Sequence, residues 1–343
     1  MLVFALYVSN HGFGHAARVA ALAKEFAALG IYCHIRSNRP GFIFAGIDPH
    51  YCVLENASMD FGVKHGSNLV ADLPRTKEML LDLMNRRPEL IAEEVEFLRN
   101  HKIDLILADI PFLVMEAANY ANVPVFAISN FDWVFIYAGL FKNDRDMKPV
   151  INCIHGLYSH ASHAFMLPFG SPKSMASCPR REKIGLLARQ NEIYTDIRER
   201  FALPPEARLL LCMFGGEGVP EIDMKALCQG FDGFVISTNP KVGERNHLRV
   251  NPDDDFIDLI HGVDLILTKP GYSTFAEAAQ FGKFILYYER ENYPEERVLV
   301  QGLRRYPFKQ RIDRLCMDSD AWEQLFQDLS ISPARLPKAF TNQ

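Results

Sequence analysis

The sequence contains no CxxC pair, although it has seven cysteines among its 343 residues. An odd number of widely spread cysteines argues against a disulfide framework and against a zinc ribbon. Most of these cysteines lie in apolar runs, which is typical of buried free thiols in a cytosolic protein. We therefore expect no covalent cross-links and no cysteine-based metal centre.

A large excess of charge of one sign is also absent. The chain has 37 basic and 42 acidic residues, so the formal net charge is 37 − 42 = −5. This weakly acidic balance argues against a general nucleic-acid binder, because the neutralisation of phosphates needs a basic face. There is no basic run that indicates a polybasic membrane patch, which leaves only local peripheral membrane association open.

No apolar run is long and uninterrupted. The longest, Ile110–Phe131, contains Pro111, Glu116 and Pro124, and these residues exclude a membrane span. The apolar start of the chain, Met1–Val8, lacks the basic region and the cleavage site of a signal peptide. We therefore expect a cytoplasmic protein without a transmembrane segment.

What the sequence has is a regular alternation of strand and helix patterns. Short runs rich in Val, Ile, Leu and Phe are separated by stretches with helical spacing, and a parallel sheet that is covered on both faces has this pattern. At roughly 150 residues per domain, the length predicts two domains. The fold class predicted is α/β, with two doubly wound Rossmann-like sheets that face a cleft. The predicted strands are Leu2–Val8, Tyr32–Ile35, Asp104–Ala108, Val123–Ile128, Ala164–Leu167, Leu209–Phe214, Phe234–Ser237, Asp264–Thr268 and Phe284–Tyr288.

The segment Pro168–Arg181 interrupts this alternation with three prolines and several small polar residues. Such a composition is typical of an interdomain linker. We therefore expect a first domain at 1–170, a linker at 171–182 and a second domain at 183–320. The remaining residues, 321–343, are expected to form a helix and tail that pack back on the first domain.

The first predicted strand leads into a glycine loop, Asn10–Arg18, with the sequence NHGFGHAAR. Gly12 and Gly14 allow a tight turn that brings the amides of a helix N-terminus close to an anion. Together with Ala17 they satisfy a loose dinucleotide fingerprint. The second strand is followed by Arg36–Arg39, without an acid but suited to an NADP phosphate, so an NADP oxidoreductase is one alternative.

His15 follows the second glycine directly and is expected to point into the cleft. A histidine titrates near neutral pH and is a suitable base for a hydroxyl group. The alternative is that His15 caps the helix or bonds a backbone group. Asp109 ends a later strand at the same edge of the sheet, where it either orients His15 or caps the following helix. His11 also lies in the loop, but its spacing from His15 does not predict a metal pair.

Two further loops in the second half of the chain indicate a phosphate site. The first, Phe214–Gly218, presents the amides of Gly215 and Gly216 after a buried strand. The second, Lys269–Ala279, begins with Lys269 and Gly271, and then has Ser273 and Thr274 as predicted helix caps whose hydroxyls and amides suit a phosphate.

Glu277 lies one turn into the helix of this second loop. A carboxylate there could accept hydrogen bonds from the two hydroxyls of a ribose, and the set as a whole then describes a nucleoside diphosphate site. The alternative is that Glu277 is a favourable charge in the first helical turn.

The segment Asn130–Trp133 follows another strand at the edge of the predicted sheet. Trp133 is either an aromatic platform for a sugar, with Asn130 or Asp132 bonded to its hydroxyls, or a buried side chain under a helix. His155, His160 and His163 have no cysteine or carboxylate that would complete a metal site, and they are interpreted as a surface helix. No metal site is predicted.

These motifs, in this order, resemble those of GT-B glycosyltransferases of the MurG-like, family 28-like kind, and especially the glycosyltransferase-like N-terminal region of plant L-arabinokinase. The segments that carry the resemblance are Asn10–Arg18, Asp104–Ala118, Ser129–Tyr137, Phe214–Gly218 and Lys269–Ala279. One departure from the family pattern is Glu217, an acid in the phosphate loop that would repel a diphosphate if it pointed inward.

The resemblance implies that the domain at 1–170 is the acceptor side and that the domain at 183–320 binds the nucleotide sugar. It also implies roles for individual residues. His15 would be the base, Asp109 its orienting carboxylate, Glu277 the ribose ligand and Lys269 a phosphate ligand. Contacts to the donor sugar would come from Glu295, Glu296 and Gln301.

The function predicted is transfer of a sugar from a nucleotide-diphosphate donor, with a UDP-sugar favoured, to a hydroxyl acceptor. Inversion at the anomeric carbon is expected, without a metal or any cofactor besides the donor. The alternatives are a nucleotide-sugar hydrolase or epimerase, a non-catalytic nucleotide-sugar-binding module, and the NADP oxidoreductase.

Overall fold

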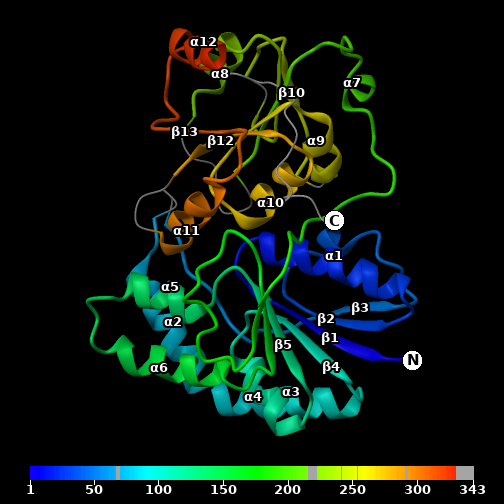
Figure 1. Ribbon diagram of the computed structural model, residues 1–343, viewed down its shortest axis with the longest axis vertical. Helices are drawn as coiled ribbons and strands as arrows, with labels where there is room; N and C mark the ends of the chain where they lie inside the picture. The colour runs from blue at the N-terminus through cyan, green and yellow to red at the C-terminus, as the bar shows by residue number, and fades with distance from the viewer. Residues whose placement is uncertain (67–69, 215–221, 241, 253, 290–292, 330–343) are drawn as a thin grey trace. The chain divides into compact units, whose positions relative to one another are not determined.

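The computed structural model describes residues 1–66, 70–214, 222–240, 242–252, 254–289 and 293–329 (Figure 1). The chain divides into two compact units. The first comprises Met1–Leu187 and Asn292–Gly302, and the second comprises Ala188–Glu291 and Leu303–Gln343. Among the described residues, none of the helices combines the length and the hydropathy that a bilayer crossing requires.

The first unit is built on a parallel sheet of seven strands in the order β3-β2-β1-β4-β5-β6-β7. Its central strands are almost fully buried because helices cover both faces, which explains their continuous apolar sequences. The strands are β1 (Val3–Val8), β2 (Tyr32–Arg36), β3 (Cys52–Glu55), β4 (Leu105–Asp109), β5 (Val125–Ser129), β6 (His163–Met166) and β7 (Arg181–Lys183).

Helix α1 covers one face of this sheet, and α3 and α4 lie on the other face (Figure 1). The helices of the unit are α1 (Gly14–Ala28), the short 3₁₀ helix η1 (Gly41–Phe44), α2 (Leu73–Asn85), α3 (Arg87–Asn100), α4 (Leu113–Ala121), α5 (Trp133–Leu140) and α6 (Met147–Tyr158), together with all but the last residue of α11 (Pro294–Leu303). The core beneath α3–α6 is rich in large aromatic side chains, among them Phe112, Trp133 and Tyr137, which are fully buried.

The second unit repeats the design with six parallel strands in the order β10-β9-β8-β11-β12-β13. Its strands are β8 (Leu209–Cys212), β9 (Phe234–Ser237), β10 (His247–Arg249), β11 (Leu265–Thr268), β12 (Phe284–Tyr288) and β13 (Lys309–Ile312). Its helices are α7 (Ile197–Arg200), α8 (Met224–Gly230), α9 (Phe256–Gly262), α10 (Tyr272–Gln280) and α12 (Ser319–Asp328). The predicted α/β class with two doubly wound parallel sheets is therefore confirmed.

Each sheet has one point at which the strand order reverses. In the first unit it lies between β1 and β4, and in the second it lies between β8 and β11. Ligands of open parallel sheets bind at the carboxyl ends of the two strands at such a point. The loops that follow β1, β4 and β11 contain the motifs that the sequence singles out.

Two expectations about domain boundaries differ from the structure. The predicted linker at 171–182 belongs to the first unit, because its end forms the edge strand β7 and its residues Met175 and Cys178 are buried. The prolines therefore shape a packed loop within this unit. Residues 292–302, expected in the second domain, also belong to the first unit.

The C-terminal helix α12 belongs to the second unit. It lies against α8 of the second unit, and the fully buried Trp322 anchors it there. The close approach of the two helices is possible because Gly230 has no side chain: a Cβ there would lie 2.6 Å from Cβ of Trp322. The predicted tail, residues 330–343, lies outside the described residues.

Candidate functional site

The glycine loop joins β1 to α1 and places His15 at the start of the helix. Gly12 has φ of +61°, the left-handed conformation that the turn requires and that glycine adopts without strain. Helix α1 begins at Gly14, and its N-cap, Phe13, makes no side-chain capping bond. His15 is 5% exposed, and its side chain faces another strand instead of capping the helix.

That strand is β4, whose last residue is Asp109. Strands β1 and β4 are paired so that Val8 lies opposite Asp109. Nδ1 of His15 lies 3.0 Å from Oδ1 of Asp109, which is fully buried. The capping alternative for Asp109 does not hold, because α4 begins at Leu113 with Phe112 as its N-cap.

A strained turn directly after Asp109 fixes its position. Ile110 has φ of +62°, which is an outlier for a β-branched residue. Its carbonyl accepts a hydrogen bond of 2.7 Å from the buried hydroxyl of Tyr158. Strained backbone of this kind persists only where the surroundings hold it, and it is concentrated at functional sites.

The carboxylate of Asp109 is shared with Arg18, which is 2% exposed. Arg18 binds it through Nε at 2.5 Å from Oδ2 and through Nη2 at 2.8 Å from Oδ1. Burial alone would raise the pKa of Asp109, but the positive charge of Arg18 and the interaction with His15 outweigh it and lower the pKa below its usual value of 3.8. Asp109 is therefore an ionised carboxylate at neutral pH.

The same arginine also approaches the histidine. Nη2 of Arg18 lies 2.7 Å from Nδ1 of His15. If Nδ1 carries the proton, it donates to Asp109 and leaves the lone pair of Nε2 as a base. If Nδ1 accepts from Arg18, the proton lies on Nε2 and that atom cannot act as a base. Asp109 and Arg18 thus favour opposite tautomers.

A hydrogen-bonded chain continues from Arg18 to a helix far along the sequence. Nη1 of Arg18 donates to Oδ1 of Asn130 at 2.9 Å, and Nδ2 of Asn130 donates to Oε1 of Glu295 at 3.1 Å. The sequence predicts Asn130 as a ligand of sugar hydroxyls and Glu295 as a contact of the donor sugar. The structure connects both to the histidine network within the first unit.

Asp60 binds the backbone of the glycine loop by a hydrogen bond. Its carboxylate, 1% exposed, accepts hydrogen bonds from the backbone N–H of Asn10 at 2.9 Å and from Nε1 of Trp133 at 2.7 Å. Burial raises the pKa of Asp60, and these hydrogen bonds only partly oppose it. Asp60 thus joins the loop that carries His15 to helix α5.

In the second unit, helix α10 begins directly after the loop that follows β11. Its N-cap is Gly271, so Ser273 and Thr274 lie in its first turn and are not caps. Both are partly exposed, as is Lys269. The first N–H groups of any helix have no intrahelical partner, and this terminus therefore suits an anion. The other predicted phosphate ligands, Gly215 and Gly216, lie outside the described residues.

Glu277 lies in the second turn of α10, which does not fit the alternative of a first-turn charge. Its carboxylate, 2% exposed, is paired with Arg189: Nε lies 2.8 Å from Oε1 and Nη2 lies 3.4 Å from Oε2. The predicted ribose ligand is thus already engaged by a cation of the same unit.

No protein-family model matches this sequence. The chain is 26% identical over 311 residues to L-arabinokinase of Arabidopsis thaliana, a match that covers 89% of this chain but only 30% of that protein. It is 22% identical over 253 residues to an uncharacterised glycosyltransferase of Methanopyrus kandleri, covering 65% of this chain and 71% of that protein. The chain thus spans less than a third of the first relative's length.

Solved structures resemble this one over almost the whole chain. UGT2 of Phytolacca americana, complexed with UDP-2-fluoro-glucose and pterostilbene, has a TM-score of 0.68 at 13% identity, covering 99% of this chain and 92% of its own. UGT89C1 of Arabidopsis thaliana, complexed with UDP, has a TM-score of 0.66 at 12% identity, covering 96% and 91%. The glycotransferase of kitacinnamycin has a TM-score of 0.64 at 16% identity, covering 96% and 91%.

The chain has a GT-B glycosyltransferase-like fold. In this GT-B-like chain, Trp133 is fully buried and forms part of the core, the second of the two alternatives for this residue. Asp132 is the N-cap of α5, accepts from the backbone N–H of Phe135 at 2.7 Å, and also binds the backbone N–H of Met175. The side chains of Trp133 and Asp132 are therefore both part of the buried interior of the first unit.

The remaining predicted residues have different surroundings. Nε2 of His11 lies 3.0 Å from the hydroxyl of Tyr293, next to the ring of Trp133. On α11, Glu296 is buried whereas Gln301 is exposed. His155 lies on the exposed face of α6, but His163 is in strand β6, where it pairs with Glu182.

Sequence reasoning missed three residues of these sites: Arg18, Asp60 and Arg189. A signal for Arg18 exists, since it lies three residues after His15 and shares a helix face with it. Asp60 and Arg189 follow no recognisable motif. Their partners lie 50 or more residues away in the sequence.

Proposed function

We propose that this chain is a glycosyltransferase that transfers a sugar from a nucleoside diphosphate to a hydroxyl acceptor. The observation that carries the proposal is the buried His15–Asp109 pair at the reversal point of the first sheet, 3.0 Å apart. A buried histidine whose Nδ1 donates to an ionised carboxylate can act as a general base through Nε2. The GT-B-like fold and the UDP-bound structures that resemble this chain support the choice of reaction.

In the proposed reaction, Nε2 of His15 removes the proton of the acceptor hydroxyl. The acceptor oxygen forms a bond to the anomeric carbon while the bond from that carbon to the diphosphate breaks. The electron pair of this bond leaves with the diphosphate. A single displacement of this kind inverts the anomeric centre. Asp109 keeps the proton on Nδ1 and stabilises the imidazolium that forms.

The second unit is proposed to hold the donor. Phosphate oxygens would bind at the N-terminus of α10 near Ser273 and Thr274, with Lys269 beside them, and the helix dipole would stabilise the leaving charge in place of a metal. The ribose hydroxyls would bind Glu277, for which they would compete with Arg189. The favoured donor is a UDP-sugar.

Thermal unfolding with UDP, GDP, dTDP and NADP, each added to the full chain, tests the donor site. A ligand at 100 times its Kd stabilises the folded state by about 2.7 kcal/mol. We expect UDP to raise the Tm of the wild type but not that of Glu277→Gln. The matched control is Glu199→Gln, which alters an exposed glutamate of the same unit.

Other outcomes of this experiment point to the alternatives. Stabilisation by NADP alone would overturn the proposal in favour of an oxidoreductase. In the structure, Arg36 is already paired with Glu94 through bonds of 3.0 and 2.9 Å and stacks on Phe97, which weighs against an NADP phosphate at that position. Stabilisation by none of the four nucleotides would remove the donor site and leave only the fold.

Turnover measurements distinguish a transferase from a hydrolase and from a binding module. We expect release of UDP from a UDP-sugar to depend on an added hydroxyl acceptor and to fall by roughly 100-fold or more in His15→Gln, while UDP still stabilises this variant. Release of UDP without an acceptor would indicate a hydrolase. Binding without turnover, unchanged by His15→Gln, would indicate a binding module.

A further inference from the structure

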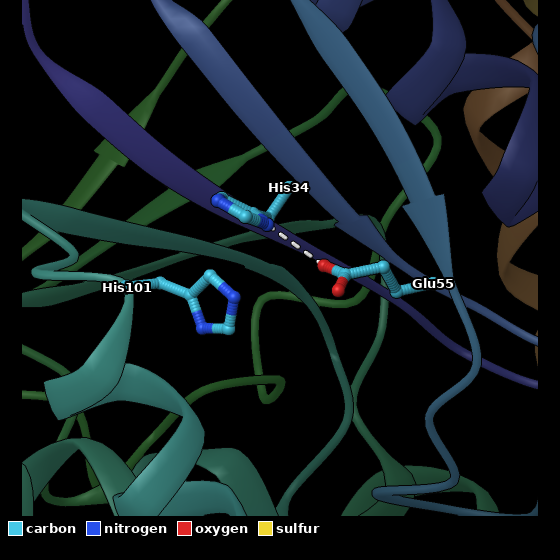
Figure 2. A group of neighbouring side chains, drawn as sticks. All are labelled: His34, Glu55 and His101. Atoms are coloured by element: carbon cyan, nitrogen blue, oxygen red, sulfur yellow. Dashed lines mark hydrogen bonds and ion pairs between the residues drawn. The ribbon is translucent and has the colours of Figure 1, made fainter.

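A second cluster of titratable side chains lies apart from the His15 network in the first unit. His34 of β2, Glu55 at the end of β3 and His101 at the C-cap of α3 come together on the sheet face that α3 covers (Figure 2). One ligand atom from each lies within 4.8 Å of the other two, and no other group of this kind occurs in the described part of the chain.

The hydrogen bond of His101 fixes its tautomer. Its Nδ1 lies 3.0 Å from the carbonyl oxygen of Phe97 and must donate to it. The lone pair is therefore on Nε2, and this edge of the ring is turned toward Glu55 (Figure 2). Histidines that bind metals commonly donate their other N–H to a backbone carbonyl in this way.

The side chain of His34 is also held in place by its neighbours. It is 7% exposed, and the rings of Phe97 and His101 hold it at centroid distances of 5.5 and 4.6 Å. Nδ1 of His34 lies 2.7 Å from Oε2 of Glu55. A cation placed between these two atoms would replace the proton that they share.

The electrostatic surroundings favour a cation. The nearby guanidinium of Arg36 is bound by both carboxylate oxygens of Glu94, so its charge is largely balanced by that partner. His101 follows the last turn of α3, where the carbonyl groups of the helix give the negative end of its dipole. The Glu55 carboxylate adds a full negative charge.

We propose that His34, Glu55 and His101 form a Zn²⁺ site. Two imidazoles and one carboxylate are a donor set that zinc accepts with a fourth ligand from water. Water can reach the ion because His101 is exposed, and the same exposure lets its ring move the short distance that bonds of about 2.0–2.2 Å require.

The ion would join the end of α3 to the edge of the sheet, and would take no part in the chemistry at His15. In the register of the sheet, His34 lies level with Ala5, whereas Asp109 lies level with Val8, at the carboxyl ends of the strands. We expect zinc to raise the stability of the first unit. This inference does not depend on the proposed function.

The test is calorimetric titration of the full chain with Zn²⁺ after removal of metals by a chelator. We expect one strong site in the wild type, and binding weaker by roughly 10-fold or more in His101→Ala and in Glu55→Gln. The matched control is His163→Ala. His163 also pairs with a carboxylate, that of Glu182 at 3.3 Å, but within the described residues it belongs to no group of three ligands.

Titration with Co²⁺ separates this site from the cysteines, of which Cys316 is exposed. A site of nitrogen and oxygen ligands gives visible absorption without the near-ultraviolet band of thiolate ligation. Full zinc affinity in His101→Ala, a thiolate band, or no stoichiometric binding to the wild type would each overturn the proposal. A rise of the Tm with Zn²⁺ in the wild type and in His163→Ala, but not in His101→Ala, would support it.

Discussion

Arg18 lies closer to Nδ1 of His15 than the carboxylate of Asp109 does: its Nη2 is 2.7 Å from that nitrogen, whereas Oδ1 of Asp109 is 3.0 Å away. A cation therefore lies beside the pair of residues that we propose as base and orienting group. It balances the charge of the carboxylate, and it competes with the carboxylate for Nδ1 of His15.

This arrangement predicts the behaviour of Arg18→Lys. A lysine keeps the positive charge but loses the bidentate contact with Asp109 and the donor beside Nδ1 of His15. We therefore expect the free energy of unfolding to fall by about 1–3 kcal/mol. We also expect the rate of sugar transfer to fall, because the carboxylate that orients His15 is then held less firmly. Urea unfolding and initial rates measure both effects.

The control for Arg18→Lys is Arg87→Lys. Arg87 also binds a carboxylate through two nitrogens, at 2.6 and 2.8 Å from Glu116, but it takes no part in the His15 network. It should lose stability without any change in the rate of sugar transfer. A rate that falls equally in both variants would contradict the role given to Arg18.

The raised pKa of the buried Asp60 predicts that the stability of the protein depends on pH. Its pKa in the folded state is raised above the usual 3.8 by burial, so its contribution is fully present below pH 3.8 and is lost as the pH rises through the raised pKa. The free energy of unfolding of the wild type minus that of Asp60→Asn should therefore fall with increasing pH, from about pH 4 upward. A difference that grows with pH for Asp60→Asn would contradict this prediction.

Gly62 predicts a steric effect on the loop. Its φ is +80°, and a Cβ there would lie 2.8 Å from Cβ of His11. The control is Gly46→Ala, where φ is +84° and no atom lies within 4 Å of the added Cβ. Gly46→Ala should cost about 1 kcal/mol and Gly62→Ala about 1–3 kcal/mol more, measured by urea unfolding. Equal costs would mean that the loop moves away freely.

The Arg189–Glu277 ion pair should affect both the stability of the protein and the stabilisation that a bound nucleotide provides. Arg189→Gln leaves a carboxylate that is 2% exposed without its cation, so we expect a loss of about 1–3 kcal/mol. Arg200→Gln, which breaks an ion pair to Asp254 with a partly exposed arginine, should cost less than about 1 kcal/mol. UDP should then raise the Tm of Arg189→Gln more than that of the wild type, since the ribose no longer competes with Arg189. A smaller rise would mean that Arg189 assists binding.

The central strands of both sheets could be predicted from the sequence because each is buried on two faces and therefore apolar throughout. Four strands were not predicted from the sequence, namely β3, β7, β10 and β13. All are short strands at the edges of the sheets. Strand β7 consists of Arg181, Glu182 and Lys183, each of them exposed, so its composition does not distinguish it from a loop.

The candidate site was accessible from the sequence only in part. His15 and Asp109 follow strands, and the carboxyl ends of neighbouring parallel strands meet at one edge, so their proximity could be predicted. The zinc ligands could not, because His34, Glu55 and His101 have no metal-ligand spacing in the chain. The same holds for the pairing of Glu277 with Arg189.

The sequence by itself determined the α/β class, the two parallel sheets and the place of the glycine loop, because these depend on local apolar periodicity and on residues that allow a tight turn. Only the tertiary structure decided that Arg18 shares the carboxylate of Asp109, that residues 292–302 join the first unit, and that Trp133 is buried. These outcomes depend on which distant segments the strand order brings together. A local pattern records whether a side chain is buried, but not which partner it meets there.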